Sequence, residues 1–176
     1  VADDTQFAAD VNEQINKIVD QYIEEANQRI AEYREAFLAT GGTEEEFEQK
    51  NIQVDVDYEI LSETEDRVSF VLRAAESDIS AGKEIVYYHL DLATGKVLTL
   101  QDVLGEDWVN ICNSSIQEQM AANTDVSYFS EDQGGFTTVD ENTSFYLDED
   151  GSVVVVFPKY SIAPGAYGEQ TFRIDA

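Results

Sequence analysis

Large apolar side chains recur every three or four residues through the first forty positions of the chain. They are Phe7, Val11, Ile15, Ile18, Tyr22, Ala26, Ile30, Tyr33 and Phe37. This spacing places them on one face of an α-helix, with Asp and Glu on the other faces. We predict a helix of about 33 residues, roughly 50 Å long, that begins after a cap at Asp4 or Thr5 and ends at Gly41-Gly42.

A helix of that length has two interpretations. The first is that it lies across a β-sheet and buries its apolar face there. The second is that its N-terminal half extends the domain towards a membrane anchor or a partner helix, as a juxtamembrane stalk does. The apolar stripe is too irregular to predict a coiled-coil dimer.

The middle of the chain has the two-residue period of β-strands. Apolar and acidic residues alternate strictly over 52–60, which predicts a half-buried strand with one solvated face. Residues 63–66 turn the chain, and 68–72 return antiparallel. Residues 83–92 are apolar on both faces, which predicts a central strand.

Short helices are predicted from their capping signals. Thr43 and Glu46 form a capping box, which assigns the acidic run at 44–46 to a helical first turn. Thr99 caps a second short helix that Gly105 ends. Asp107 is expected to cap a third, whose core stripe is Trp108, Cys112, Ile116 and Met120. We interpret Cys112 on that stripe as a small buried apolar group and not a nucleophile.

The C-terminal thirty residues carry the strongest local signals. Asp150-Gly151 between two apolar runs predicts a hairpin with a type I′ turn, which needs positive φ at both central residues. Residues 153–157 are apolar on both faces and predict a central strand. Pro158 ends that strand, and a glycine-punctuated loop with two tyrosines follows before the last short strand.

A connection of about twenty residues, 123–142, is rich in Asp, Ser, Thr and Gly. Connections of that length inside compact domains are uncommon and are often functional or mobile. We interpret it either as a second candidate contact region or as a surface loop held down by its aromatic residues Tyr128, Phe129 and Phe136.

The charge of the chain excludes some classes of partner. Its 37 acidic and 10 basic residues give a formal net charge of −27, which repels nucleic acid and anionic lipid. The same charge favours encounter with a basic protein. The sequence holds no apolar run long enough to span a membrane, and its one cysteine forms no internal disulfide. Because the chain begins at Val1 rather than Met, we expect a preceding signal or anchor segment to have been removed.

Catalytic and metal-binding patterns are weak in this sequence. His89, the single histidine, lies mid-strand, and we expect a satisfied, half-buried side chain there. One His and one Cys do not make a zinc site, and Asp148-x-Asp150-Gly151 departs from a calcium loop. A glycosidase-like carboxylate pair stays open but none stands out. We therefore predict a non-enzymatic protein without cofactor or metal.

Two stretches resemble a known family. The first runs Phe145-Tyr146-Leu147, an acidic turn, an apolar strand, Pro158-x-Tyr160, Ile162-Ala163-Pro164 and Gly168. The second, 88–104, is similar to a strand, a Thr-Gly turn and a short helix in the same family. Together they resemble the RsiV-like C-terminal domain, a domain of unknown function, over roughly 52–174. The family's Gly-Gly-Ala-His-like segment has no counterpart at 74–83, and neither does the polysaccharide-deacetylase module of some relatives.

We predict an α+β fold in which a long N-terminal helix and a second helix pack on a twisted antiparallel β-sheet. Residues 1–176 form a single domain, with the long helix at 1–40 and the RsiV-like sheet domain at 52–176. The resemblance implies an extracellular or cell-surface binding or sensing module of a bacterial cell envelope, similar to the lysozyme-recognising ectodomain of a membrane anti-sigma factor.

The resemblance also points to a contact. Pro158, Lys159 and Tyr160 look like the partner-facing loop of lysozyme-binding relatives, and a tyrosine offers a rigid aromatic anchor with a polar tip. In the alternative interpretation Tyr160 is a core residue. Two other functions stay open: an exported structural domain without a protein ligand, and a carboxylate-dependent cell-wall hydrolase. Exposure of Pro158 and Tyr160 favours the binding module over the structural domain.

Overall fold

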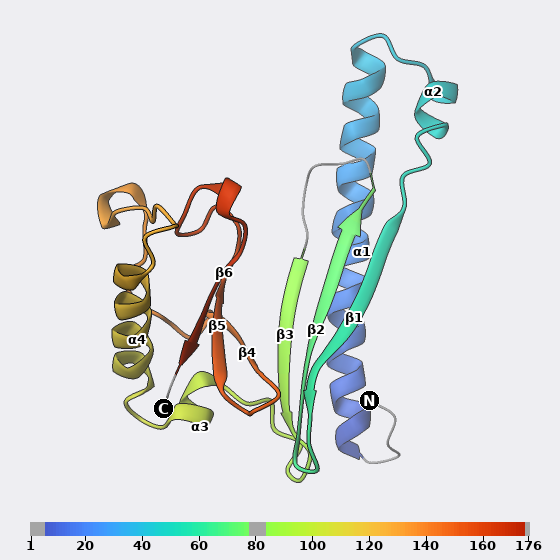
Figure 1. Ribbon diagram of the computed structural model, residues 1–176. Coiled ribbons are helices and arrows are strands. Elements are labelled where there is room, and N and C mark those ends of the chain that lie inside the picture. Colours follow the sequence, from blue (N-terminus) through green and yellow to red (C-terminus); the bar gives the residue numbers. More distant parts are fainter. Residues whose placement is uncertain (1–5, 78–83, 175–176) are drawn as a thin grey trace. The chain divides into compact units, whose positions relative to one another are not determined.

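The computed structural model describes residues 6–77 and 84–174, and its architecture is α+β (Figure 1). A long N-terminal helix, further short helices and antiparallel strands confirm the predicted class. The strands form two three-stranded sheets, not the single sheet that we expected. The predicted cap at Asp4 or Thr5 and the segment 78–83 lie outside the described residues.

The chain divides into two compact units. One comprises residues 1–59 and 71–86, and the other comprises 60–70 and 87–176. The three strands of the first sheet contribute residues to both units. This division separates compact regions but does not test whether they fold alone, so the single domain stays a prediction.

Helix α1 (Gln6–Ala39) is the main element of the first unit. Tyr22 and Ala26 are buried and pack against Ala74 of β2. The side chains of Ile18 and Val19 line the same apolar groove as strand residues. The middle of the helix therefore lies on the sheet, as the first interpretation expected (Figure 1).

A buried ion pair ties α1 to the sheet. Arg29 Nε donates to Glu76 Oε1 over 2.7 Å, and the Glu76 side chain is 0% exposed. The Arg29 guanidinium also lies over the Tyr22 ring, 5.2 Å from its centroid. A buried carboxylate requires such compensation, because removing it from water is costly.

Helix α2 (Glu44–Glu48) confirms the predicted capping box. The Thr43 backbone N–H donates to Glu46 over 2.9 Å, and the Glu46 N–H donates to the Thr43 hydroxyl over 3.3 Å. These hydrogen bonds from Thr43 lower the pKa of the Glu46 carboxyl. Gly42, with no side chain, leaves room for the Phe37 ring.

The first sheet has the order β1-β2-β3, with β1 at Val54–Glu63, β2 at Arg67–Glu76 and β3 at Glu84–Asp91. The central strand is β2, so the prediction of a central position for 83–92 was wrong. Residues 88–90 are nevertheless buried on both faces, which explains their apolar composition. Strand β1 is an edge strand and more exposed than expected, with Tyr58 66% exposed.

The second sheet has the order β4-β5-β6, with β4 at Ser144–Leu147, β5 at Val153–Phe157 and β6 at Gln170–Ile174, all antiparallel. The central position of β5 is confirmed, and its four valines are buried on both faces. Leu147 pairs with Val153 at one end of the sheet, and Phe157 pairs with Gln170 at the other.

Helices α3 (Leu100–Leu104) and α4 (Trp108–Ala122) complete the second unit. Thr99 caps α3 through a capping box with Asp102, and hydrogen bonds from Lys96 and Thr99 lower the pKa of Asp102 to about 2. Asp107 is the N-cap residue of α4, as predicted, but its carboxylate accepts from the Asn110 side chain instead of from the helix backbone.

The predicted stripe on α4 is confirmed. Cys112 and Ile116 are completely buried, and Trp108 and Met120 pack at the edge of the same core. This core joins α4 to one face of the second sheet, as the side-by-side positions of α4 and β6 in Figure 1 also show.

The hairpin at 147–153 is confirmed, but its turn type is not the predicted one. Gly151 has φ +79°, whereas Asp150 is not among the residues with positive φ. The Asp148 N–H pairs with the Ser152 carbonyl at 3.0 Å, which leaves a three-residue loop. A three-residue loop that ends in a left-handed glycine is the next most common hairpin connection.

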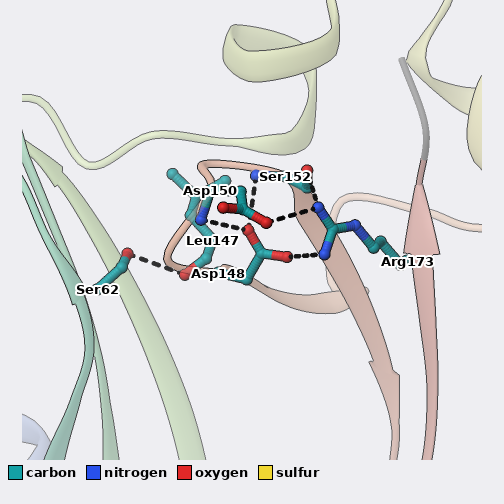
Figure 2. A network of polar contacts seen from close by, with 6 residues as sticks. All are labelled: Ser62, Leu147, Asp148, Asp150, Ser152 and Arg173. Carbon is teal, nitrogen blue, oxygen red and sulfur yellow. Dashed lines mark hydrogen bonds and ion pairs between the residues drawn. The ribbon is translucent and has the colours of Figure 1, made fainter.

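Arg173 of β6 holds that turn in place (Figure 2). Its guanidinium contacts the Asp148 carboxylate at 2.9 Å and the Asp150 carboxylate at 3.1 Å, and donates to the Ser152 hydroxyl over 2.9 Å. Ser62 donates to the Leu147 carbonyl on the other side of the turn, over 2.9 Å. The two carboxylates are therefore engaged by a cation of the chain itself.

Candidate functional site: the turn at 158–160

The candidate contact is a tight turn at the end of β5. The Ser161 N–H donates to the Pro158 carbonyl over 3.0 Å, so Lys159 and Tyr160 are the two central residues of a β-turn. Pro158 ends the strand because it has no N–H for the ladder. The buried residues Ile162 and Ala163 follow directly and anchor the turn to the core.

Tyr160 has an unusual backbone conformation. Its φ is +73°, and Asn51 is the other described residue besides glycine with a positive φ. The third position of a turn with positive φ is normally occupied by glycine. A residue with a Cβ pays about 1–2 kcal/mol for the left-handed region, so the fold maintains a strained tyrosine where glycine is easier. Such strain often marks a functional position.

The Tyr160 side chain is exposed but held in place. It is 69% exposed, and Pro158 and Lys159 beside it are exposed too. The ring lies against the backbone of buried Gly165, where an added Cβ would be 2.0 Å from the ring. The Lys159 ammonium lies 5.1 Å from the ring centroid. Tyr160 is therefore not a core residue, and the alternative interpretation was wrong.

This arrangement is suited to binding. An aromatic ring that is already ordered loses little side-chain entropy when a partner covers it. Its hydroxyl supplies a polar tip, and Lys159 supplies three further donors. The contact of Gly165 with the Tyr160 ring could not be predicted from the sequence, which indicated only that Pro164 and Gly165 belong to a loop.

The connection 123–142 is held down in the way the second interpretation expected. Phe136 and Val139 are buried in the core of the second unit. The Asn113 side chain on α4 accepts from the Val139 N–H over 2.9 Å. The Phe129 N–H donates to the Ile162 carbonyl over 2.9 Å, which joins this segment to the chain just after the candidate turn.

His89 is more deeply buried than expected, at 2% exposed. Its Nδ1 lies 2.8 Å from the Ser69 hydroxyl, and that hydroxyl oxygen accepts from the Leu147 N–H over 3.2 Å. Burial lowers the pKa of His89 to about 4, and a backbone hydrogen bond at Phe145 acts weakly in the opposite direction. The imidazole is therefore neutral near pH 7, and its tautomer decides whether Ser69 or His89 donates in their hydrogen bond.

The Ser69–His89 pair resembles part of a catalytic dyad only in its distance. Both side chains are buried, so a substrate has no access to the hydroxyl. Ser69 was missed in the sequence because twenty positions separate it from His89 and no motif joins them. The pair is part of the packing between β2, β3 and β4.

Other candidate reactive groups are engaged or buried. Burial raises the pKa of the Cys112 thiol to about 11, which keeps it protonated at neutral pH. Within 6–77 and 84–174, no three His, Cys, Asp or Glu side chains form a group suited to a metal ion. No helix in these described ranges is both long and apolar enough to cross a bilayer.

Comparison with known proteins agrees with the resemblance. Residues 101–176 match a family described as "Protein of unknown function (DUF3298)". The anti-sigma-V factor RsiV of Bacillus subtilis (strain 168) is 25% identical over 166 residues, which cover 90% of this chain and 56% of RsiV. The chain is therefore similar to RsiV over most of its own length. It spans little more than half the length of that relative.

The fold of the RsiV-like domain is known from a crystal structure. A member of the DUF3298 family from Bacteroides fragilis NCTC 9343 matches with a TM-score of 0.58 at 19% identity, over 90% of this chain and 65% of the other. At that identity the match shows the fold alone. The named relative is described as an anti-sigma factor.

Proposed function

We propose that this RsiV-like domain is an extracytoplasmic binding module that recognises a basic protein of the lysozyme class, with the turn Pro158–Lys159–Tyr160 as the contact. The observation that carries the proposal is Tyr160, a strained aromatic residue that is 69% exposed and supported from beneath by Gly165. Exposed, ordered tyrosines are typical anchors of protein interfaces.

The charge of the chain supports a basic partner. At −27 the chain attracts cationic proteins and steers their approach, which accelerates association at low ionic strength. Charge alone gives no fitted interface, so a specific contact has to supply the rest. The turn offers this contact, because its three residues are exposed and its aromatic ring is already ordered.

The role in the cell follows the relative. RsiV is an anti-sigma factor, and a domain of this kind outside the membrane senses an extracellular signal. We propose the same localisation and a non-catalytic role here. An exported structural domain without a ligand and a carboxylate-dependent hydrolase are the alternatives, and each predicts no binding at the turn.

Isothermal calorimetry with a C-type lysozyme tests the proposal. Titrations at about 0.15 M and about 0.5 M salt separate diffuse attraction from a fitted interface, because the Debye length falls from about 8 Å to roughly 4 Å. We expect stoichiometric binding that persists at the higher salt. Binding that disappears at about 0.5 M salt, or no binding at either concentration, contradicts the proposal.

A further inference from the structure

A surface pocket of about 510 Å³ lies in the second unit. It is formed where the C-terminal end of α4 and the segment after it meet the start of β6. Its polar lining includes Gln119, Glu169 and Gln170, and its aromatic lining includes Tyr128 and Phe172. A volume of this size is in the range of small-ligand sites.

The hydrogen-bond donors of the two glutamines are already used. Gln119 Nε2 donates to the Arg173 carbonyl over 2.7 Å and to the Ser115 hydroxyl over 3.0 Å. Gln170 Nε2 donates to the backbone carbonyls of Tyr167 and Glu169 over 2.9 and 3.1 Å. Because the bonded partners include carbonyls, which only accept, the orientation of both amide groups is fixed.

The acceptor oxygens are left over. Neither Gln119 Oε1 nor Gln170 Oε1 has a hydrogen-bond partner within 6–77 and 84–174, and neither is enclosed by protein. Gln170 itself is only 8% exposed, but its oxygen reaches the surface of the pocket wall. Both oxygens are therefore available to a hydrogen-bond donor on a ligand.

The charge of the pocket also favours a cationic ligand that donates hydrogen bonds. The Glu169 carboxylate makes no ion pair with another residue of the described ranges, and no Lys, Arg or His is in the lining. The rings of Tyr128 and Phe172 lie next to each other, with centroids 6.2 Å apart. The pocket thus combines a carboxylate, two amide oxygens and aromatic surface.

We propose that this pocket binds a guanidinium group, the side chain of an arginine on a partner protein. Guanidinium carries five N–H donors in a planar fork and no acceptor, and it stacks on aromatic rings. An anion is repelled by the Glu169 carboxylate, and the amide donors of Gln119 and Gln170 are occupied. The ammonium of lysine supplies a point charge but not the planar fork.

The position of the pocket connects it to the turn. Phe157 at the end of β5 pairs with Gln170 of the pocket lining, and Pro158 follows Phe157 directly in the chain. The pocket and the turn are therefore connected through the Phe157–Gln170 pair. The inference deepens the proposed function and rests on it for the identity of the partner, although the pocket itself is testable with a small peptide.

The test is an NMR titration of the whole chain with three peptides. They are acetyl-Gly-Arg-Gly amide, the same peptide with lysine, which keeps the charge, and the same peptide with citrulline, which keeps the shape without the charge. We expect the arginine peptide to shift the side-chain amides of Gln119 and Gln170 saturably, with a Kd in roughly the millimolar range. The lysine peptide binds more weakly, and the citrulline peptide does not bind.

Matched variants separate the pocket from the acidic surface. Glu169→Gln weakens arginine binding about fivefold, whereas Glu149→Gln, which removes an equally exposed charge from the β4–β5 turn of the same unit, leaves it unchanged. Equal binding of the arginine and lysine peptides, or equal effects of both variants, overturns the pocket in favour of diffuse attraction.

The two proposals fail separately. Lysozyme binding without any effect of the arginine peptide on the glutamine amides overturns the pocket and leaves the proposed function standing. Saturable arginine binding without lysozyme binding supports the pocket and contradicts the partner.

Discussion

Replacement of His89 by asparagine is expected to change how stability depends on pH. Burial lowers the pKa of His89 from 6.5 to about 4 in the folded chain, so the fold prefers the neutral imidazole. The unfolded chain binds a proton near the ordinary pKa. The contribution of the neutral His89 to the free energy of unfolding is therefore complete above about pH 6.5 and is lost as the pH falls towards 4.

The magnitude follows from the two pKa values. Their difference corresponds to about 3 kcal/mol when fully developed. At pH 5 the unfolded chain is largely protonated at this site whereas the folded chain is not. Between pH 7.5 and pH 5 the free energy of unfolding should therefore fall by about 2 kcal/mol because of His89 alone.

Urea unfolding of the wild type and of His89→Asn at both pH values measures this contribution. Asparagine does not titrate and retains an oxygen that can accept from the Ser69 hydroxyl, so the variant removes the proton-binding site. Loss of the ring contact with Phe145 lowers the stability of the variant at every pH. The quantity to compare is therefore the change in the free energy of unfolding between pH 7.5 and pH 5. The difference between this change in the wild type and in the variant cancels both the lost contact and the carboxylate titrations. His89→Gln is a second variant if asparagine does not fold. An equal change in the free energy of unfolding between the two pH values in variant and wild type refutes the buried, neutral histidine.

Three further predictions concern packing and support. Gly165→Ala places a Cβ 2.0 Å from the Tyr160 ring, so calorimetry should show weaker lysozyme binding while the unfolding midpoint changes little; unchanged binding argues against the support. Arg29→Met should destabilise the chain more than Arg29→Met combined with Glu76→Gln, because the single variant strands a buried carboxylate; the reverse order in thermal unfolding contradicts the buried pair. Val155→Ala, at a completely buried central position, should cost about 2–3 kcal/mol in urea unfolding, and a loss below 1 kcal/mol refutes the assigned core.

Local signals were read correctly from the sequence because their causes are local. The capping boxes at Thr43 and Thr99 each depend on two side chains three positions apart, and both are present. The apolar stripe of α4 follows from side-chain periodicity in the same way, and the burial of β5 on both faces follows from its unbroken run of apolar residues. The end of β5 before Pro158 fixes where the candidate turn begins.

Features that depend on long-range pairing were not predictable. The apolar strand β3 lies at the edge of its sheet, because apolar composition reports burial and not strand order. The exposure of Tyr160 depends on Gly165 and on a backbone conformation that tyrosine rarely adopts. The pairing of Ser69 with His89 and the unpaired Gln170 oxygen arise only once separate segments are brought together.

Two tyrosine variants show whether the turn at 158–160 is the binding site. Tyr160 and Tyr58 are 69% and 66% exposed, and they lie on different units. In calorimetric titrations with a C-type lysozyme at about 0.5 M salt, the account predicts that Tyr160→Ala raises the Kd at least about tenfold, whereas Tyr58→Ala leaves it within about twofold. Equal Kd values for the two variants contradict the assignment of the turn at 158–160 as the binding site.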